Sequence, residues 1–422
     1  MQDVTVAAAS IASERAQQMP RLQLTMIGAS VVVMGISQSI LYAVLPPLAR
    51  EIQLTELQVG ILISFAGIFF AMMKPFWGRL SDKRGGHWVL AIGLAGYGIA
   101  SLTLGLRIDA ARQGLLAGNL LFACLLINRL IQGSIGAATL PAAQSIVADQ
   151  SDRAARTAAL SLISAGLGIG MLLGPIIGAA LSWWSLTASF YVLGAITLVA
   201  TIIQLAAGAR RQGFRARVPK SLSLLDPRIS TFVLLDFLML TFVSLVQTVI
   251  GFIFQDRLAL TALETAQRVG VALVVSAICS LIVQVGFIRR VSPPPRQLLR
   301  LGSVLSLAGV LAMFFAGSFL SMCAGAAVIG FGLGMLNPGT MAASSIAVER
   351  SEQGAVAGLS GFSRSMGYIV GPFVGAAAYD LYHGAPLLIA AGVDAVMVVI
   401  SQASGAVRNA VAETVPVDQG AG

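Results

Sequence analysis

The stretch Gly174-Pro175-Ile176-Ile177-Gly178 returns 197 positions later as Gly371-Pro372-Phe373-Val374-Gly375. In each copy a proline, Pro141 or Pro338, stands 33 positions before the first glycine of the stretch. A chain of 422 residues that repeats itself at almost half of its length is predicted to consist of two homologous halves.

The composition places both halves in a lipid bilayer. Hydrophobic residues make up 57% of the chain and charged residues 11%, whereas about 25% of the residues of a soluble domain are charged. A repeated unit of this composition is predicted to be a bundle of membrane helices, an arrangement found in many secondary transporters.

Twelve apolar runs are long enough to cross about 30 Å of hydrocarbon, six in each half. The sequence therefore predicts an all-α membrane protein with two pseudo-symmetric six-helix bundles. The expected spans are 26–46, 57–77, 88–106, 115–138, 158–182, 187–208, 229–254, 266–288, 298–316, 318–340, 355–378 and 384–406.

The basic residues predict the orientation, because Lys and Arg are retained in cytoplasmic loops. With both termini in the cytoplasm, nineteen of the 27 Lys and Arg residues lie in inner segments and five in outer loops, while Lys74, Arg129 and Arg364 lie within spans. The net charge of +9 is spread over short inner loops, so no nucleic-acid partner is expected. We expect a monomer in the cytoplasmic (inner) membrane.

The basic segment 209–228 interrupts the apolar pattern and is the expected cytoplasmic linker. It separates an N-terminal bundle, 1–208, from a C-terminal bundle, 229–407, and the polar tail 408–422 is expected to be disordered.

The sequence argues against nucleotide or metal chemistry. A P-loop needs a lysine directly after glycine, but the residues before Lys74, Lys83 and Lys220 are Met, Asp and Pro. The two histidines lack Cys or carboxylate neighbours at metal-ligand spacing. We expect no enzyme activity, no metal and no cofactor, with a proton gradient as the energy source.

The segment Gly78-Arg79-Leu80-Ser81-Asp82-Lys83-Arg84-Gly85 is a predicted cytoplasmic loop with one acid among bases. It resembles the loop signature of the major facilitator superfamily, although a later basic pair of that signature is Gly86 and His87 here. The resemblance implies that Asp82 approaches the N-terminus of the eleventh helix, whose partial positive charge would hold it. Gly78, Asp82, Lys83 and Arg84 would then form a conformational latch.

The fourth expected span holds Arg129-Leu130-Ile131-Gln132-Gly133-Ser134-Ile135-Gly136, which resembles a second motif of that superfamily. A guanidinium within a membrane helix is costly and normally faces a cavity or a partner. In related antiporters this arginine is assigned to proton coupling, so the resemblance implies that role for Arg129. A structural arginine paired with backbone carbonyls is the alternative.

Glycines recur every four residues in the fifth expected span, at Gly166, Gly170, Gly174 and Gly178. Such a strip lets a neighbouring helix approach closely, and Pro175 removes an amide from the helix. The pattern resembles the signature of drug:proton antiporters, with Ala179 replacing the last glycine. Gly170, Gly174, Pro175 and Gly178 are the expected helix-packing motif.

A proton-driven carrier needs a carboxyl group that changes protonation within the bundle. Asp236 and Asp394 are the acids within expected spans, and the resemblance favours Asp236 because the seventh helix of this fold lines the cavity. The proton-coupling candidates are therefore Asp236, Arg129 and Asp394.

Polar and aromatic side chains within the apolar spans are candidates for a substrate cavity, because a few convergent polar groups fix the orientation of an amphipathic ligand. Each of them is also suited to hydrogen bonding between helices. Arg364 would favour an anionic or zwitterionic substrate. The candidates are Gln38, Tyr42, Gln247, Phe254, Asn337 and Arg364.

The resemblance implies a proton-coupled antiporter that exports a small amphipathic molecule, such as a drug or a siderophore, by alternating access. Two other functions remain open: a proton-symporting importer of the same fold and a non-transporting membrane sensor.

Overall fold

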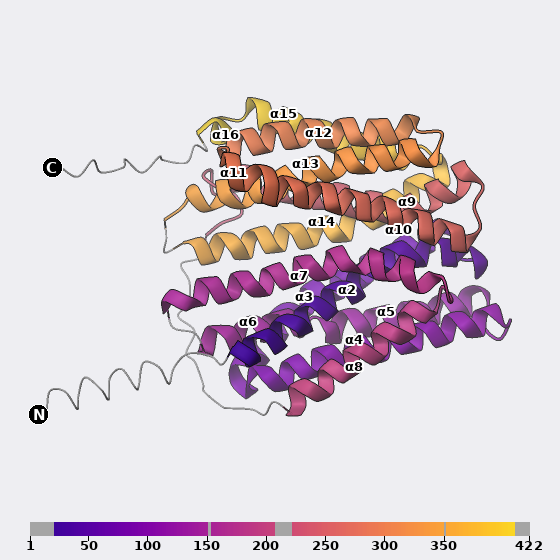
Figure 1. Ribbon diagram of the computed structural model, residues 1–422. Coiled ribbons are helices and arrows are strands. Elements are labelled where there is room, and N and C mark those ends of the chain that lie inside the picture. Colours follow the sequence, from indigo (N-terminus) through magenta and orange to yellow (C-terminus); the bar gives the residue numbers. More distant parts are fainter. Residues whose placement is uncertain (1–20, 151–152, 207–221, 350–351, 410–422) are drawn as a thin grey trace, which may run out of the picture. The chain divides into compact units, whose positions relative to one another are not determined.

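The computed structural model describes residues 21–150, 153–206, 222–349 and 352–409 (Figure 1). The regular structure of these residues is helical. The helices are α2 (Arg21–Glu51), α3 (Glu56–Arg84), α4 (Gly86–Arg112), α5 (Gly118–Gly136), α6 (Thr139–Gln150), α7 (Arg153–Ser182), α8 (Ala188–Ala206), α9 (Ser230–Leu258), α10 (Ala262–Leu281), the π-helix η1 (Ile282–Ile288), α11 (Arg289–Val291), α12 (Pro295–Phe315), α13 (Phe319–Ile346), α14 (Gln353–Leu381), α15 (Ala385–Ala403) and α16 (Gly405–Asn409).

These helices account for all twelve expected spans in the described part of the chain. Eleven helical segments are long and apolar enough to cross a membrane, among them the combined segments Gly118–Val147 and Ala262–Val291. The twelfth is α14, which has 29 residues but whose apolar content is diluted by glycines and by Arg364. The predicted all-α membrane fold is thus confirmed.

The chain divides into two compact units. The described residues of unit 1 come from Met1–Arg217 and Phe254–Val271, and those of unit 2 come from Val218–Ile253 and Ala272–Gly422. The end of α9 and the start of α10 therefore belong to unit 1. The predicted division at the linker 209–228 stays a prediction, since most of that linker and of the tail 408–422 lies outside the described residues.

In unit 1, α2 packs along α7 because glycines of α7 face it. Ser39 of α2 donates a hydrogen bond to the carbonyl of Gly170 at 3.5 Å, and a Cβ on Gly174 would overlap Ser39 Oγ. A Cβ on Gly178 would lie 2.7 Å from Ile40, which is also too close. α2 therefore packs against the glycine strip of α7.

Unit 2 repeats this packing with the equivalent glycines of α14. Ser244 of α9 donates a hydrogen bond to the carbonyl of Gly367 at 3.0 Å, and a Cβ on Gly371 would overlap Ser244 Oγ. Gly170 and Gly367 are 197 positions apart, as are Gly174 and Gly371. The sequence repeat thus corresponds to a repeated serine-on-glycine contact between two long helices.

Candidate functional site

Two oppositely charged side chains meet inside unit 2. Arg364 of α14 donates hydrogen bonds from Nε at 2.9 Å and from Nη2 at 2.8 Å to Oδ1 of Asp236 in α9. The Asp236 side chain is fully buried, whereas the Arg364 side chain is 25% exposed. Asp236 Oδ2 is buried and has no hydrogen-bond partner among the described residues. The two opposite charges cancel, and Oδ2 of Asp236 is the carboxylate oxygen that Arg364 does not contact.

A third helix holds the arginine in place. Thr340 of α13 is fully buried, and its hydroxyl accepts a hydrogen bond from Arg364 Nη2 at 3.2 Å while it donates to the carbonyl of Asn337 at 3.1 Å. Thr340 lies two positions after Pro338, whose missing amide interrupts the backbone hydrogen bonds of α13. The site therefore joins α9, α13 and α14.

The close approach of α9 and α14 explains why these side chains can meet. Ser363 Oγ donates to the carbonyl of Val233 at 2.6 Å, one turn from the ion pair. A Cβ on Gly367 would lie 2.6 Å from the carbonyl oxygen of Phe237, so a larger residue there would force the helices apart. Glycine at this position lets the backbone of α14 reach that of α9.

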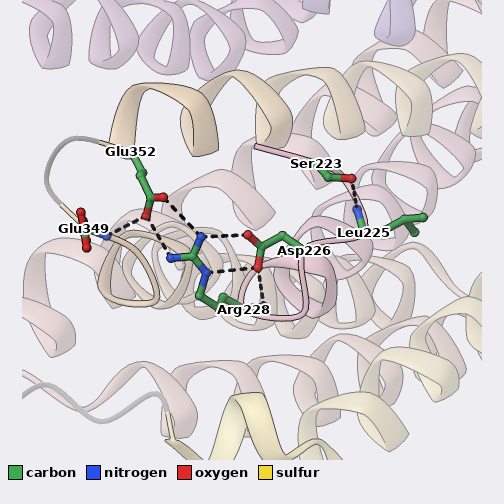
Figure 2. A network of polar contacts seen from close by, with 6 residues as sticks. All are labelled: Ser223, Leu225, Asp226, Arg228, Glu349 and Glu352. Atoms are coloured by element: carbon green, nitrogen blue, oxygen red, sulfur yellow. Dashed lines mark hydrogen bonds and ion pairs between the residues drawn. The ribbon is translucent and has the colours of Figure 1, made fainter. Parts of the chain in front are cut away.

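The same two helices are tied together at their starts (Figure 2). Arg228, just before α9, donates to both oxygens of Glu352, just before α14, at 3.0 and 3.3 Å. Asp226 accepts from the Arg228 side chain at 2.8 and 3.2 Å and from its backbone amide at 3.0 Å. These hydrogen bonds from Arg228 hold the pKa of Asp226 below its usual range.

The second candidate acid, Asp394, lies elsewhere in unit 2. It is fully buried in α15, and its Oδ2 accepts a hydrogen bond from Ser306 of α12 at 2.7 Å. Its Oδ1 is buried without a partner among the described residues, and the described ion pairs do not include Asp394. Asp394 therefore connects two helices through a hydroxyl, whereas Asp236 faces a guanidinium.

The third proton-coupling candidate, Arg129, lies in unit 1 on α5. Its Nη1 donates to Oε1 of Gln132 one turn along the same helix, and its Nε is buried without a partner among the described residues. Tyr42 and Tyr97 lie near it. Arg129 thus belongs to unit 1, whereas Asp236 and Arg364 belong to unit 2.

The predicted cytoplasmic loop at Asp82 is largely helical. Gly78 to Arg84 continue α3, and the helix ends at Gly85, whose φ of +99° lies in a region that glycine tolerates best. Asp82 accepts a hydrogen bond from Ser145 of α6 at 3.2 Å, and the side chains of Asp82, Lys83 and Arg84 are exposed. Polar residues are compatible with a helix that extends beyond the bilayer, which is why sequence alone placed a loop here. The latch between Asp82 and the eleventh helix stays a prediction.

The remaining cavity candidates differ in exposure. Tyr42 is buried and Gln38 half-buried on α2, and Phe254, near the end of α9, is fully buried. Gln247 is half-buried, with an Oε1 that has no partner among the described residues, and Asn337 is exposed. Of the six candidates, Arg364 is the one that contacts an acid of the candidate site.

Sequence reasoning missed Thr340 and the ion pairs of Arg50. Arg50 donates to Glu56 at 2.7 and 3.1 Å and to Asp256 Oδ2 at 3.0 Å, all within unit 1. The sequence does show that these charges lie at the ends of expected spans. That position alone does not identify Asp256 as the partner of Arg50, 206 positions away.

Comparison with known proteins agrees with this architecture. Residues 27–294 match the family model described as the Major Facilitator Superfamily. The quinolone resistance protein NorA of Staphylococcus aureus is 25% identical over 366 residues, which cover 85% of this chain and 90% of that protein.

Two solved structures have the same fold. A bacterial homologue of the human lysosomal transporter Spinster, in an inward-facing and occupied conformation, matches with a TM-score of 0.69 and 16% identity, over 90% of this chain and 93% of the other. A point mutant of the nucleoside transporter NupG matches with a TM-score of 0.68 and 13% identity, over 89% of this chain and 99% of the other.

Proposed function

The chain belongs to the major facilitator superfamily, and from this premise we propose that it is a proton-coupled antiporter that exports a small amphipathic organic molecule. It is a multi-pass membrane transporter and not an enzyme. The finer parts of the proposal are the proton as the driving ion, the outward direction, the monomeric state and the placement in the cytoplasmic membrane with both termini inside.

The observation that carries the proposal is the buried pair of Asp236 and Arg364. Arg364 contacts Oδ1, and Oδ2 has no partner among the described residues, so a proton can be added at Oδ2 while the existing hydrogen bonds are still in place. Protonation would remove a buried negative charge and leave Arg364 without its charged partner, which is costly inside a protein. The free energy of this arrangement of α9 and α14 therefore depends on whether the proton is bound.

Such a dependence is what a proton-driven carrier needs. A ligand shifts a conformational equilibrium only by its difference in affinity for the two states. A proton that weakens the Asp236–Arg364 pair favours states in which α9 and α14 are repositioned, and the cargo would favour the state in which the pair is intact. The proton and the cargo would then drive the carrier in opposite directions.

Similarity to NorA over 85% of the chain supports a cargo of the drug type. The proposed cargo is a drug or a secreted metabolite such as a siderophore. The remaining assignments are also proposals: a latch at Asp82, coupling by Arg129, and a part in cargo binding for the cavity candidates.

Everted membrane vesicles test the function. Respiration acidifies their interior, and a pH-sensitive dye reports proton release when lipophilic cations, fluoroquinolone-like zwitterions or siderophores are added. Proton release that depends on the protein supports antiport. Further acidification on addition of a compound would support the importer, and silence to every compound, with the protein confirmed in the membrane, would support the sensor.

A further inference from the structure

Arg129 lies within the candidate membrane span Gly118–Val147. It is eleven positions after Gly118, where α5 begins, which corresponds to about 17 Å along the helix at 1.5 Å per residue. The side chain is half-buried, and the Nε atom is buried without a hydrogen-bond partner among the described residues. A guanidinium at this depth needs compensation by an acceptor or an anion.

Other arginines of the described chain have such compensation. Arg364 contacts Asp236, and Arg50 contacts Glu56 and Asp256. The ion pairs formed by the described residues do not include Arg129, whose contact is the neutral amide of Gln132. A buried charge with a neutral partner alone is left with a large part of its desolvation cost.

The surroundings hold Arg129 in a fixed position. A Cβ on Gly133 would overlap the carbonyl of Ala66 in α3, and a Cβ on Gly136 would lie 2.5 Å from the Tyr97 ring of α4. Asn128 donates to the carbonyl of Ala100 at 3.2 Å and to Thr103 Oγ1 at 2.7 Å. The backbone on both sides of Arg129 therefore packs closely against α3 and α4. This packing fixes the position of the Arg129 backbone.

The groups around the guanidinium suit an anion. Tyr42 and Tyr97 lie near it, and a phenol hydroxyl can donate a hydrogen bond to a carboxylate. Gln132 accepts from Nη1, and the buried Nε has no acceptor among the described residues. A guanidinium fork matches a carboxylate better than it matches a neutral carbonyl.

We propose that Arg129 is the anchor for a carboxylate of the cargo, so that the transported molecule is an amphipathic acid or zwitterion. This inference rests on the proposed transport function and names the chemical class of the cargo. It gives Arg129 a part in cargo binding that is separate from the proton site at Asp236.

Equilibrium binding to the purified full-length protein tests the inference without a proton gradient. The probes are a fluorescent fluoroquinolone with a free carboxylate and its methyl ester, which has the same rings and amine. We expect the wild type to bind the acid at least about tenfold more tightly than the ester, the ratio that a difference of about 1.4 kcal/mol produces. Because no transport is involved, failure of proton coupling in vesicles leaves this result unaffected.

Three variants test whether Arg129 causes the preference for the acid over the ester. In Arg129→Gln the acid and the ester are expected to bind equally, and Arg129→Lys, which keeps the charge without the planar fork, is expected to retain a reduced preference. Arg107→Gln is the matched control, because Arg107 donates to the carbonyl of Thr103 in its own helix. It is expected to keep the wild-type ratio.

Equal binding of acid and ester by the wild type, or no binding of the acid, overturns the inference. An unchanged ratio in Arg129→Gln also overturns it. If Arg129→Gln does not fold, as judged by gel filtration, an unchanged ratio in Arg129→Lys overturns it instead.

Discussion

Arg364 places both of its hydrogen bonds to Asp236 on a single carboxylate oxygen, from Nε at 2.9 Å and from Nη2 at 2.8 Å. The other oxygen has no partner among the described residues. In the proposed mechanism, this second oxygen is the position at which the coupling proton binds. An ion pair in which both carboxylate oxygens accept hydrogen bonds would not offer such a position.

Asp394 is expected to be dispensable for proton coupling. Its Oδ2 accepts from Ser306 Oγ, and an asparagine can make the same hydrogen bond with its amide oxygen. Asp394→Asn should therefore keep proton-driven transport near the wild-type level. Asp394→Leu should lower stability by about 1–3 kcal/mol, because Ser306 would be left buried and unpaired. Loss of gradient-driven transport in a well-folded Asp394→Asn protein would contradict this assignment.

The close packing of α9 against α14 predicts that alanine substitutions at two glycines of α14 differ in their effect on stability. Gly371→Ala would place a methyl group against Ser244 Oγ and 2.6 Å from the carbonyl oxygen of Thr241, so it should destabilise the protein by about 1–3 kcal/mol. Gly358→Ala meets nothing within 4 Å and should be neutral or slightly stabilising. Thermal unfolding of the purified variants measures both. Equal midpoints for the two variants would contradict the packing described for α14.

Arg50 and Asp256 are expected to be energetically coupled within unit 1. Their side chains are 27% and 26% exposed, so the coupling should be on the order of 1 kcal/mol or less and should decrease at high salt. A double-mutant cycle of Arg50→Gln and Asp256→Asn, read by thermal unfolding, measures it. Strict additivity of the two substitutions at low salt would contradict the ion pair.

The Asp226 cluster predicts a dependence of stability on acidity. Hydrogen bonds from the Arg228 side chain and its backbone amide lower the pKa of Asp226 in the folded protein. The stabilisation is therefore fully present above the ordinary carboxyl pKa of about 4 and is lost as the pH falls through the lowered value. Between about pH 6 and pH 3, which brackets that ordinary value, the unfolding midpoint of the wild type should fall more steeply than that of Asp226→Asn. Parallel curves would show that this cluster contributes nothing to the acid dependence.

The fold was accessible from the sequence because the repeat of Gly174 at Gly371 and the apolar runs around it depend on local composition. The partners of charged residues were not accessible. Asp236 and Arg364 are 128 positions apart, and their contact depends on how α9 and α14 are rotated about their axes. The spacing of residues along one helix does not determine how that helix is rotated relative to a neighbouring helix.

The extension of α3 through Asp82 and the π-helix η1 were missed for a different reason. Polar residues at the end of a span are compatible with either a loop or a continued helix, and Asp82 was expected in a loop. The residues Ile282–Ile288 have ordinary apolar composition, so nothing in them signals a wider helical turn. Thr340 was missed because its partner Arg364 lies on another helix, 24 positions along the chain.

The central claim is that Asp236 carries the coupling proton, and transport by Asp236→Asn in proteoliposomes tests it most directly. The account predicts that this variant still exchanges labelled cargo for unlabelled cargo when no gradient is present, because the binding and reorientation steps are retained. It also predicts that an imposed pH gradient no longer drives accumulation, whereas it does in the wild type and in Asp394→Asn. Gradient-driven accumulation by Asp236→Asn at the wild-type level would contradict the account.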